Sequence, residues 1–167
     1  MNILVTVASK HGATGEIGEG LAAALRASGL SIETQAPDTV TSLDRFDAVI
    51  LGSAVYASRW MDCATQFAER FATELADREV WLFSSGPIGD PPTPKEEPQA
   101  TLALAARLGA RGHRSFAGRL DPDKLGFFER TITRALKAPP GDFRDWEAIR
   151  AWADEIATAL ADQRVPA

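Results

Sequence analysis

Residues 3–14 read ILVTVASKHGAT, and this stretch decides the fold of the chain. Residues 3–8 form a nearly continuous apolar run, which is typical of a strand buried on both faces of a parallel sheet. They lead directly into a short loop that contains Ser9, Gly12 and Thr14 and opens an amphipathic segment. Free backbone N–H groups at the start of such a helix, together with the helix dipole, favour an anion in the loop. The stretch therefore predicts a cradle for the phosphate end of a nucleotide-type cofactor.

The rest of the chain alternates between strand and helix patterns. Strands are expected over residues 3–8, 31–35, 47–52, 79–84 and 114–118, and helices over residues 16–27, 61–75, 100–108, 124–137 and 145–160. Strands separated by helices form right-handed βαβ units, which place helices on both faces of a parallel sheet. The prediction is an α/β fold with a doubly wound five-stranded parallel sheet in the order 2-1-3-4-5. One domain is expected to span residues 1–167.

Length and composition fit a single soluble domain. A chain of 167 residues can bury a substantial core, and its hydrophobic content of 45% is ordinary. The net charge of −5 argues against nucleic acid as a partner. Cys63 is the single cysteine, so no internal disulfide can form, and we expect it to be a small packed residue. With no signal-peptide pattern and no apolar run of about 20 residues, we expect a cytoplasmic protein.

Three loops are expected to meet at one edge of the sheet, because ligand sites in such sheets lie at the carboxyl ends of the strands. They are residues 9–14, 53–60 and 85–90. The second loop holds Tyr56 and Trp60, whose rings can stack on a planar heterocycle. The third is rich in glycine and proline, so its backbone can approach a ligand closely. Any one loop alone is better explained as a helix cap or ordinary core, but three together favour a ligand, and their chemistry suits FMN.

The sequence does not support other common nucleotide-binding, catalytic or metal-binding motifs. The stretch GEGLAA over residues 18–23 matches a dinucleotide fingerprint in spacing, but it lies inside the first expected helix instead of opening it. The chain contains no GxxxxGK[ST] and no GxSxG, and its Cys and His residues lack metal-ligand spacing. The strand ends carry no acidic residues of the kind that a phosphate-accepting response regulator needs. No general acid or base is assigned, since hydride can pass directly to a flavin.

With these residues in place, the chain resembles the flavodoxin-like FMN-binding proteins, in particular the group that includes menaquinone-dependent protoporphyrinogen oxidase. The similarity rests on ILVTVASKHGATGEIGEGLAAAL (3–25), DAVILGSAVYASRW (47–60), SFAGRLD (115–121) and DFRDWEAIRAWADEI (142–156). The first stretch is shared by most FMN-binding flavodoxin-like proteins, and the last two are more particular to the oxidase group. The resemblance implies non-covalently bound FMN.

Carried over by position, the resemblance implies three sets of cofactor-binding residues. The FMN phosphate would be held by Ser9, Lys10, His11, Gly12, Ala13 and Thr14. One side of the isoalloxazine would be lined by Ser53, Ala54, Val55, Tyr56, Ala57, Ser58 and Arg59, and the other by Ser85, Gly86, Pro87, Ile88 and Gly89. Two positions depart from the relatives. Ala13 stands where flavodoxins commonly carry Asn or Gln, and Tyr56 stands where the oxidase carries Arg.

Two functions follow from this resemblance. The first is an FMN-dependent oxidoreductase related to protoporphyrinogen oxidase, acting on a quinone or a porphyrinogen-type small molecule. The alternative is a flavodoxin-type electron-transfer protein with a redox partner protein and no small-molecule substrate. A domain that has lost its flavin and serves as an interaction module is a third possibility. A spectrum of the protein with and without FMN separates the third from the first two.

Two further segments carry hypotheses. Arg59 near the flavin ring would stabilise the reduced flavin and raise its potential; the alternative is that it points to solvent. The expected helix over residues 124–137 carries basic residues Arg130, Arg134 and Lys137 on one face. This face is either solvated or a peripheral contact with an anionic membrane.

Overall fold

A five-stranded parallel sheet forms the centre of the computed structural model, which describes residues 1–86, 97–124, 126, 130, 131, 133 and 139–162. Its strands are β1 (Asn2–Ala8), β2 (Ser31–Gln35), β3 (Ala48–Tyr56), β5 (Glu79–Ser85) and β6 (Gly112–Phe116). They lie in the order β2-β1-β3-β5-β6, and each pairs with its neighbour in parallel. This order confirms the sequence-based prediction 2-1-3-4-5.

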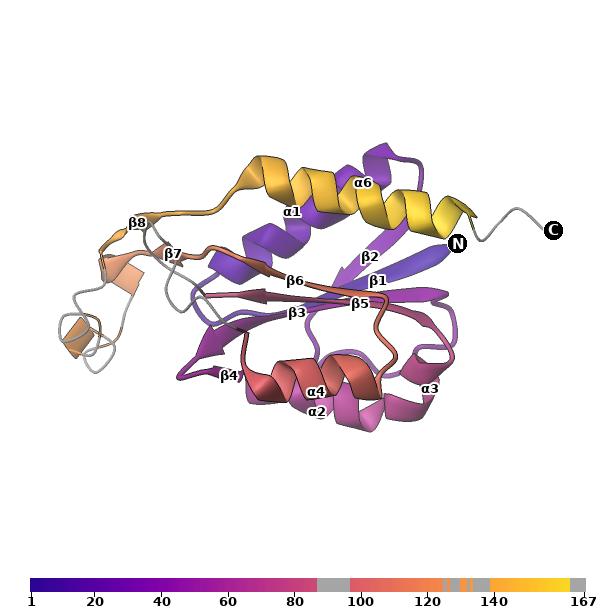
Figure 1. The fold of residues 1–167 in the computed structure, drawn as a ribbon, viewed down its shortest axis with the longest axis horizontal. Helices are drawn as coiled ribbons and strands as arrows, with labels where there is room; N and C mark the ends of the chain where they lie inside the picture. Colours follow the sequence, from indigo (N-terminus) through magenta and orange to yellow (C-terminus); the bar gives the residue numbers. More distant parts are fainter. Residues whose placement is uncertain (87–96, 125, 127–129, 132, 134–138, 163–167) are drawn as a thin grey trace.

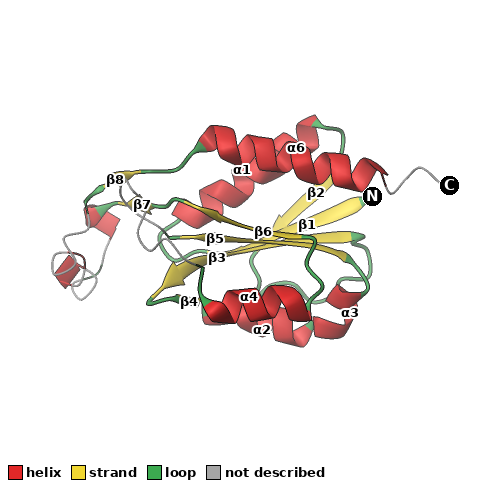
Figure 2. Cartoon of the chain, in the orientation of Figure 1, coloured by secondary structure: helices red, strands yellow, loops and turns green. Residues whose placement is uncertain are grey.

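Helices cover both faces of the sheet (Figure 1). The helices α1 (Ala13–Ala27) and α6 (Trp146–Asp162) lie on one face, and α2 (Asp62–Arg70), α3 (Ala72–Ala76) and α4 (Gln99–Arg107) lie on the other. Figure 2 shows the resulting three layers by element type. Alternate residues of a strand face opposite sides, so Val49 and Leu51 pack in the core under α2 and α4, whereas Ile50 packs in the core under α1 and α6.

Several elements differ from the sequence-based expectation. The single helix expected over residues 61–75 is two helices, because Phe71 has φ −107° and ψ 20° and ends α2 before α3 begins. Two short antiparallel pairings were missed: β4 (Arg59–Trp60) pairs with the end of β3, and β7 (Arg119–Leu120) pairs with β8 (Gly141–Asp142). Strands of two residues are too short to show a hydrophobic period.

The segment after β7 begins with a 3₁₀ turn over Pro122–Lys124. The helix expected over residues 124–137 lies largely outside the described residues, and within it residues 130, 131 and 133 are helical. Because residues 134 and 137 lie outside the described residues, the structure does not test the membrane-contact face expected on this helix. Within the described ranges, no helix is both long enough and apolar enough to cross a membrane.

Candidate cofactor site

A cavity of about 670 Å³ opens where β1, β3 and β5 end. Its volume falls within the range of about 300–1,000 Å³ that is usual for small-molecule sites. Its described lining comprises Ser9, Lys10, His11, Ala13 and Thr14, then Ala54, Val55, Tyr56 and Ala57, then Ser85 and Gly86, and lastly Gly118, Arg119, Leu120, Asp121, Lys124 and Thr133. The structure thus brings together the three loops expected from the sequence and adds a fourth segment after β6.

The first loop turns tightly into α1. Gly12 has φ +87°, which a residue with a side chain rarely adopts, and its N–H donates to the Ser9 Oγ at 3.1 Å. The helix begins at Ala13, and no side-chain hydrogen bond caps it among the described residues. Ala13 and Thr14 both line the cavity, so the N–H groups of the first helical turn lie beside it. Gly12 shapes this loop without lining the cavity itself.

The second loop is the hairpin that joins β3 to β4. Ser53 is fully buried and does not line the cavity; its Oγ accepts the N–H of Met61 at 3.0 Å and donates to the carbonyl of Ala54 at 2.9 Å. Tyr56 is 40% exposed, and its ring lies edge-on to that of His11, with centroids 6.2 Å apart. One aromatic wall expected from the sequence is therefore present.

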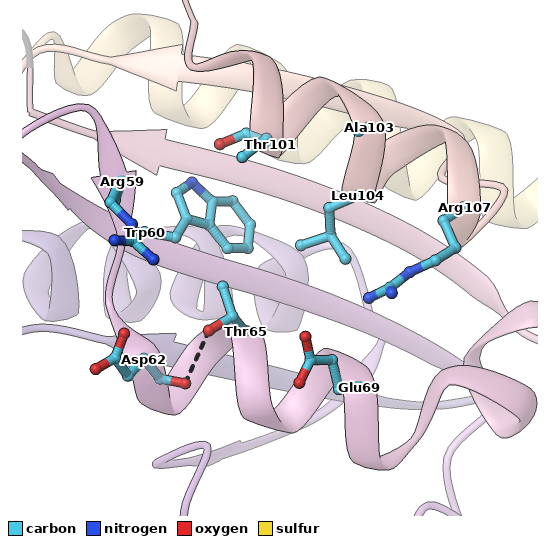
Figure 3. Close-up of a pocket in the computed structure, with 10 residues that line it drawn as sticks. Arg59, Trp60, Asp62, Thr65, Glu69, Thr101, Ala103, Leu104 and Arg107 are labelled. Carbon is cyan, nitrogen blue, oxygen red and sulfur yellow. Dashed lines mark hydrogen bonds between the residues drawn. The ribbon is translucent and has the colours of Figure 1, made fainter.

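The other expected aromatic wall is absent from this cavity, so the prediction that Trp60 lines it is wrong. The Trp60 Nε1–H donates to the Ser84 Oγ at 2.8 Å, which holds the indole in the core under α2 and α4. Arg59 and Trp60 instead line a second cavity of about 360 Å³ between these two helices (Figure 3). Arg59 and Ser58 do not line the larger cavity.

A buried polar cluster lies beneath Trp60. The Ser84 Oγ is 3.1 Å from the His113 Nε2, and Glu97 accepts a short hydrogen bond from Ser84 and lies 3.4 Å from the same imidazole nitrogen. Burial lowers the pKa of His113, and the Glu97 carboxylate opposes this effect. Ser84 and Ser85 are consecutive in β5, so they face opposite sides of the sheet and the cluster stands apart from the larger cavity. The cluster ties the base of the hairpin to β5 and β6.

The third loop is described as far as Gly86. A Cβ on Gly86 would lie 3.2 Å from both the Cβ and the carbonyl oxygen of Val55, so a glycine lets the third loop pass close to the second. Ser85 and Gly86 line the cavity as expected. Pro87, Ile88 and Gly89, which are expected to line one side of the ring, lie outside the described residues.

The fourth segment is held against α1 by a network of charged side chains. Arg144, whose side chain is 4% exposed, donates to both carboxylate oxygens of Asp142 at 2.8 and 2.6 Å and to Glu16 at 2.7 Å. Arg119 donates to both oxygens of the same Glu16 at 3.1 and 2.9 Å. Hydrogen bonds from Arg144 lower the pKa of both Glu16 and Asp142. These pairs attach the two paired strands β7 and β8 to the first turn of α1.

The sequence predicts no cofactor-binding role for this fourth segment. Residues 118–121 fall in the stretch SFAGRLD, and Asp142 and Arg144 fall in DFRDW, which the resemblance marks only as landmarks of a group of relatives. Lys124 and Thr133 fall in the expected helix over residues 124–137, for which the sequence suggests a membrane contact and no contact with FMN. The spacing of the charges carries no signal, because Glu16 and Arg119 are 103 positions apart. Only the fold brings them together.

The hairpin of the second loop gives a first prediction. Ala57 and Ser58 have φ +47° and +59°, the left-handed values that a two-residue type I′ turn requires and that residues other than Gly, Asn and Asp adopt at a cost. The double variant Ala57→Asn with Ser58→Gly is expected to raise the free energy of unfolding by about 1–2 kcal/mol. Urea denaturation measures it. A double variant that is no more stable than the wild type would contradict the explanation.

Comparison with known proteins supports the fold independently. Residues 4–146 match the family model described as a flavodoxin domain. A flavodoxin from the domain Archaea shares 13% identity with a TM-score of 0.66, covering 96% of this chain and 99% of that chain. Oxidised flavodoxin 1 from Bacillus cereus shares 15% identity with a TM-score of 0.65, covering 95% and 98%. No curated protein matches the chain.

A longer protein also contains this fold. Rubredoxin oxygen:oxidoreductase from Desulfovibrio gigas shares 12% identity with a TM-score of 0.70, and the alignment covers 99% of this chain but 37% of that chain. At these identities the solved structures establish the shared fold alone.

Proposed function

Because this chain belongs to the flavodoxin-domain family, we propose that it binds FMN in the 670 Å³ cavity and exchanges electrons with a protein partner. The observation that carries the proposal is the meeting of the phosphate-type loop, the Tyr56 hairpin and the third loop around one cavity at the carboxyl edge of the sheet. Bound flavin would supply the electron-accepting chemistry, and the protein would bind, orient and tune it.

The chemistry of the cavity fits a phosphorylated flavin. Its described lining carries three cationic side chains, Lys10, Arg119 and Lys124, against one carboxylate, Asp121. This balance is opposite in sign to the net charge of −5 of the whole chain. The Ser9 and Thr14 hydroxyls and the first turn of α1 would hold the phosphate, as hydrogen-bond donors at a helix start commonly do.

At the other end, Tyr56 and the backbone around Gly86 would flank the isoalloxazine. Tyr56 offers a partly exposed ring for stacking, and the glycine allows the third loop to approach a flat ligand closely. Arg59 is left out of this ring site because it lines the second cavity. The effect of Arg59 on the flavin potential stays a hypothesis, which a redox titration of Arg59→Ala tests.

A second candidate function is an FMN-dependent oxidoreductase that acts on a quinone or a porphyrinogen. It is favoured by the similarity of residues 115–121 and 142–156 to the protoporphyrinogen oxidase group, since the first stretch includes β7, which lines the cavity, and the second begins at Asp142 of β8, which pairs with β7. In this case the basic residues of the 124–137 segment would serve as a peripheral contact with an anionic membrane. Sedimentation with anionic vesicles at low salt tests that contact.

A reductive titration separates the two candidates. The purified protein is saturated with FMN and reduced stepwise while its absorbance is followed. Electron transfer to a protein partner predicts two resolved one-electron steps with a half-reduced flavin that accumulates. A single two-electron step, together with steady turnover of a quinone or a porphyrinogen, would instead support the oxidoreductase. A protein that takes up no FMN would contradict both and leave an interaction module.

A further inference from the structure

Arg119 is the cationic residue of the cavity whose position is fixed most fully by described contacts. It lies in β7, lines the cavity, and is held by Glu16 in the first turn of α1. We propose that Arg119 selects a phosphorylated flavin over the unphosphorylated form, and that Glu16 and Arg144 position it for this purpose. The inference rests on the proposed function and assigns to that site a specificity residue from outside its three expected loops.

The geometry places Arg119 at the phosphate end of the cavity. Its partner Glu16 lies one turn or less from Ala13 and Thr14, both of which line the cavity. Arg144, the second partner of Glu16, is also 3.4 Å from the carbonyl oxygen of Ala13. The guanidinium of Arg119 is therefore anchored beside the first turn of α1, where the backbone N–H groups already favour an anion.

The hydrogen-bonding capacity of Arg119 leaves donors for a ligand. A guanidinium carries five N–H donors, and the two hydrogen bonds to Glu16 use one from each terminal nitrogen. The Arg119 guanidinium can thus keep both hydrogen bonds to Glu16 while its other N–H groups donate to a phosphate. Its side chain is 21% exposed, so it is partly shielded from water yet open to the cavity. Phosphate recognition by arginine is geometrically specific, whereas lysine acts as a point charge.

The charges of the neighbouring side chains explain why Glu16 has two arginine partners. Glu16 alone would place a carboxylate next to the phosphate and repel it. Arg119 and Arg144 both bind this carboxylate, and Asp142 in turn binds Arg144. The four side chains sum to no net charge, so the network cancels the repulsion of Glu16 while presenting the donors of Arg119. Arg144 acts through Glu16 and is a positioning residue.

Titrations of the flavin-free protein with FMN and with riboflavin test this proposal, because the two ligands differ in the phosphate alone. Quenching of flavin fluorescence gives each Kd. For Arg119→Gln we expect the Kd for FMN to rise about tenfold or more and the Kd for riboflavin to stay unchanged. The loss of FMN affinity should become smaller when the ionic strength rises from about 0.01 M to about 1 M, because the Debye length falls from about 30 Å to about 3 Å. Arg119→Lys should fall between the wild type and Arg119→Gln.

Arg114→Gln is the matched control. Arg114 donates to Glu155 at 3.1 Å in a similar exposed pair between β6 and α6, and it does not line the cavity. Its removal should leave both Kd values unchanged. Glu16→Gln is expected to reduce the preference for FMN less than Arg119→Gln does, and the double variant should show less than the sum of the two effects.

The outcomes separate this inference from the proposed function. A wild-type protein that binds neither flavin overturns the proposed function and the inference together. A wild-type protein that binds FMN, with an Arg119→Gln variant that weakens both flavins equally or neither, overturns the inference alone. Thermal unfolding of each variant identifies any that fail to fold, and Arg119→Lys then serves in place of Arg119→Gln.

Discussion

Replacing Ala13 by aspartate is expected to weaken FMN binding by about a hundredfold or more, whereas the equally large asparagine is expected to strengthen it. Ala13 is the first residue of α1 and lines the cavity beside Thr14. Two unit charges about 4 Å apart interact by about 4 kcal/mol at an effective dielectric constant near 20, and the flavin phosphate carries up to two. The asparagine variant adds an amide donor at the same place, as flavodoxins commonly have.

Protein stability provides the control for this pair. A carboxylate in the first turn of a helix interacts favourably with the helix dipole, by about 0.3–1 kcal/mol. The aspartate variant should therefore fold at least as well as the wild type, and its loss of FMN cannot come from unfolding. Equal FMN affinities for Ala13→Asp and Ala13→Asn, measured by fluorescence titration, would show that no phosphate lies beside this turn.

Replacing Gly52 by alanine is expected to lower the free energy of unfolding by about 3 kcal/mol. Gly52 lies in β3 directly opposite Phe83 of β5, and a Cβ on Gly52 would overlap the Phe83 ring. That ring is fully buried and is held edge-on by Phe116 and Trp152, with centroids 6.0 and 6.2 Å away. Because these neighbours hold the buried ring in place, the added methyl group is expected to strain the strands that carry the site.

Urea denaturation of two further variants tests whether the clash between Gly52→Ala and Phe83 causes the loss of stability. Gly112→Ala in β6 adds the same methyl group, but there it lies 3.4 Å from Trp81, an ordinary contact, and its effect should be small. Phe83→Leu combined with Gly52→Ala should recover part of the loss, because the smaller side chain leaves room for the methyl group. A large loss at Gly112, or no recovery in the double variant, would contradict the steric explanation.

The fold could be predicted from the sequence because its strands are strongly marked. Residues 3–8 and residues 48–52 are largely buried on both faces, and a helix follows each strand, α1 after β1 and α2 after the β3–β4 hairpin. The break at Phe71 could not be predicted, since no glycine or proline stands between residues 61 and 76 and the spacing of Phe67, Phe71 and Leu75 continues an unbroken helical period.

The sequence predicts which loops form the candidate site, but it does not predict the directions in which their side chains point. The order of strands placed Ser9, Tyr56 and Ser85 at one edge, and the cavity is lined by all three. The prediction that Trp60 lines the cavity is wrong because a sequence pattern does not show on which side of a hairpin a side chain lies. The Trp60 indole instead donates a hydrogen bond to Ser84. The role of Arg119 could not be predicted, because its partner Glu16 is 103 positions away in the sequence and only the fold brings the two side chains together.

The visible absorption spectrum of the purified protein, recorded before and after the addition of FMN, decides whether this chain is a flavoprotein. We expect flavin bands that stay with the protein on gel filtration, either as purified or after uptake of FMN into the cavity lined by Ser9, Tyr56 and Arg119. A colourless protein that takes up no FMN would show that this cavity is not a flavin site.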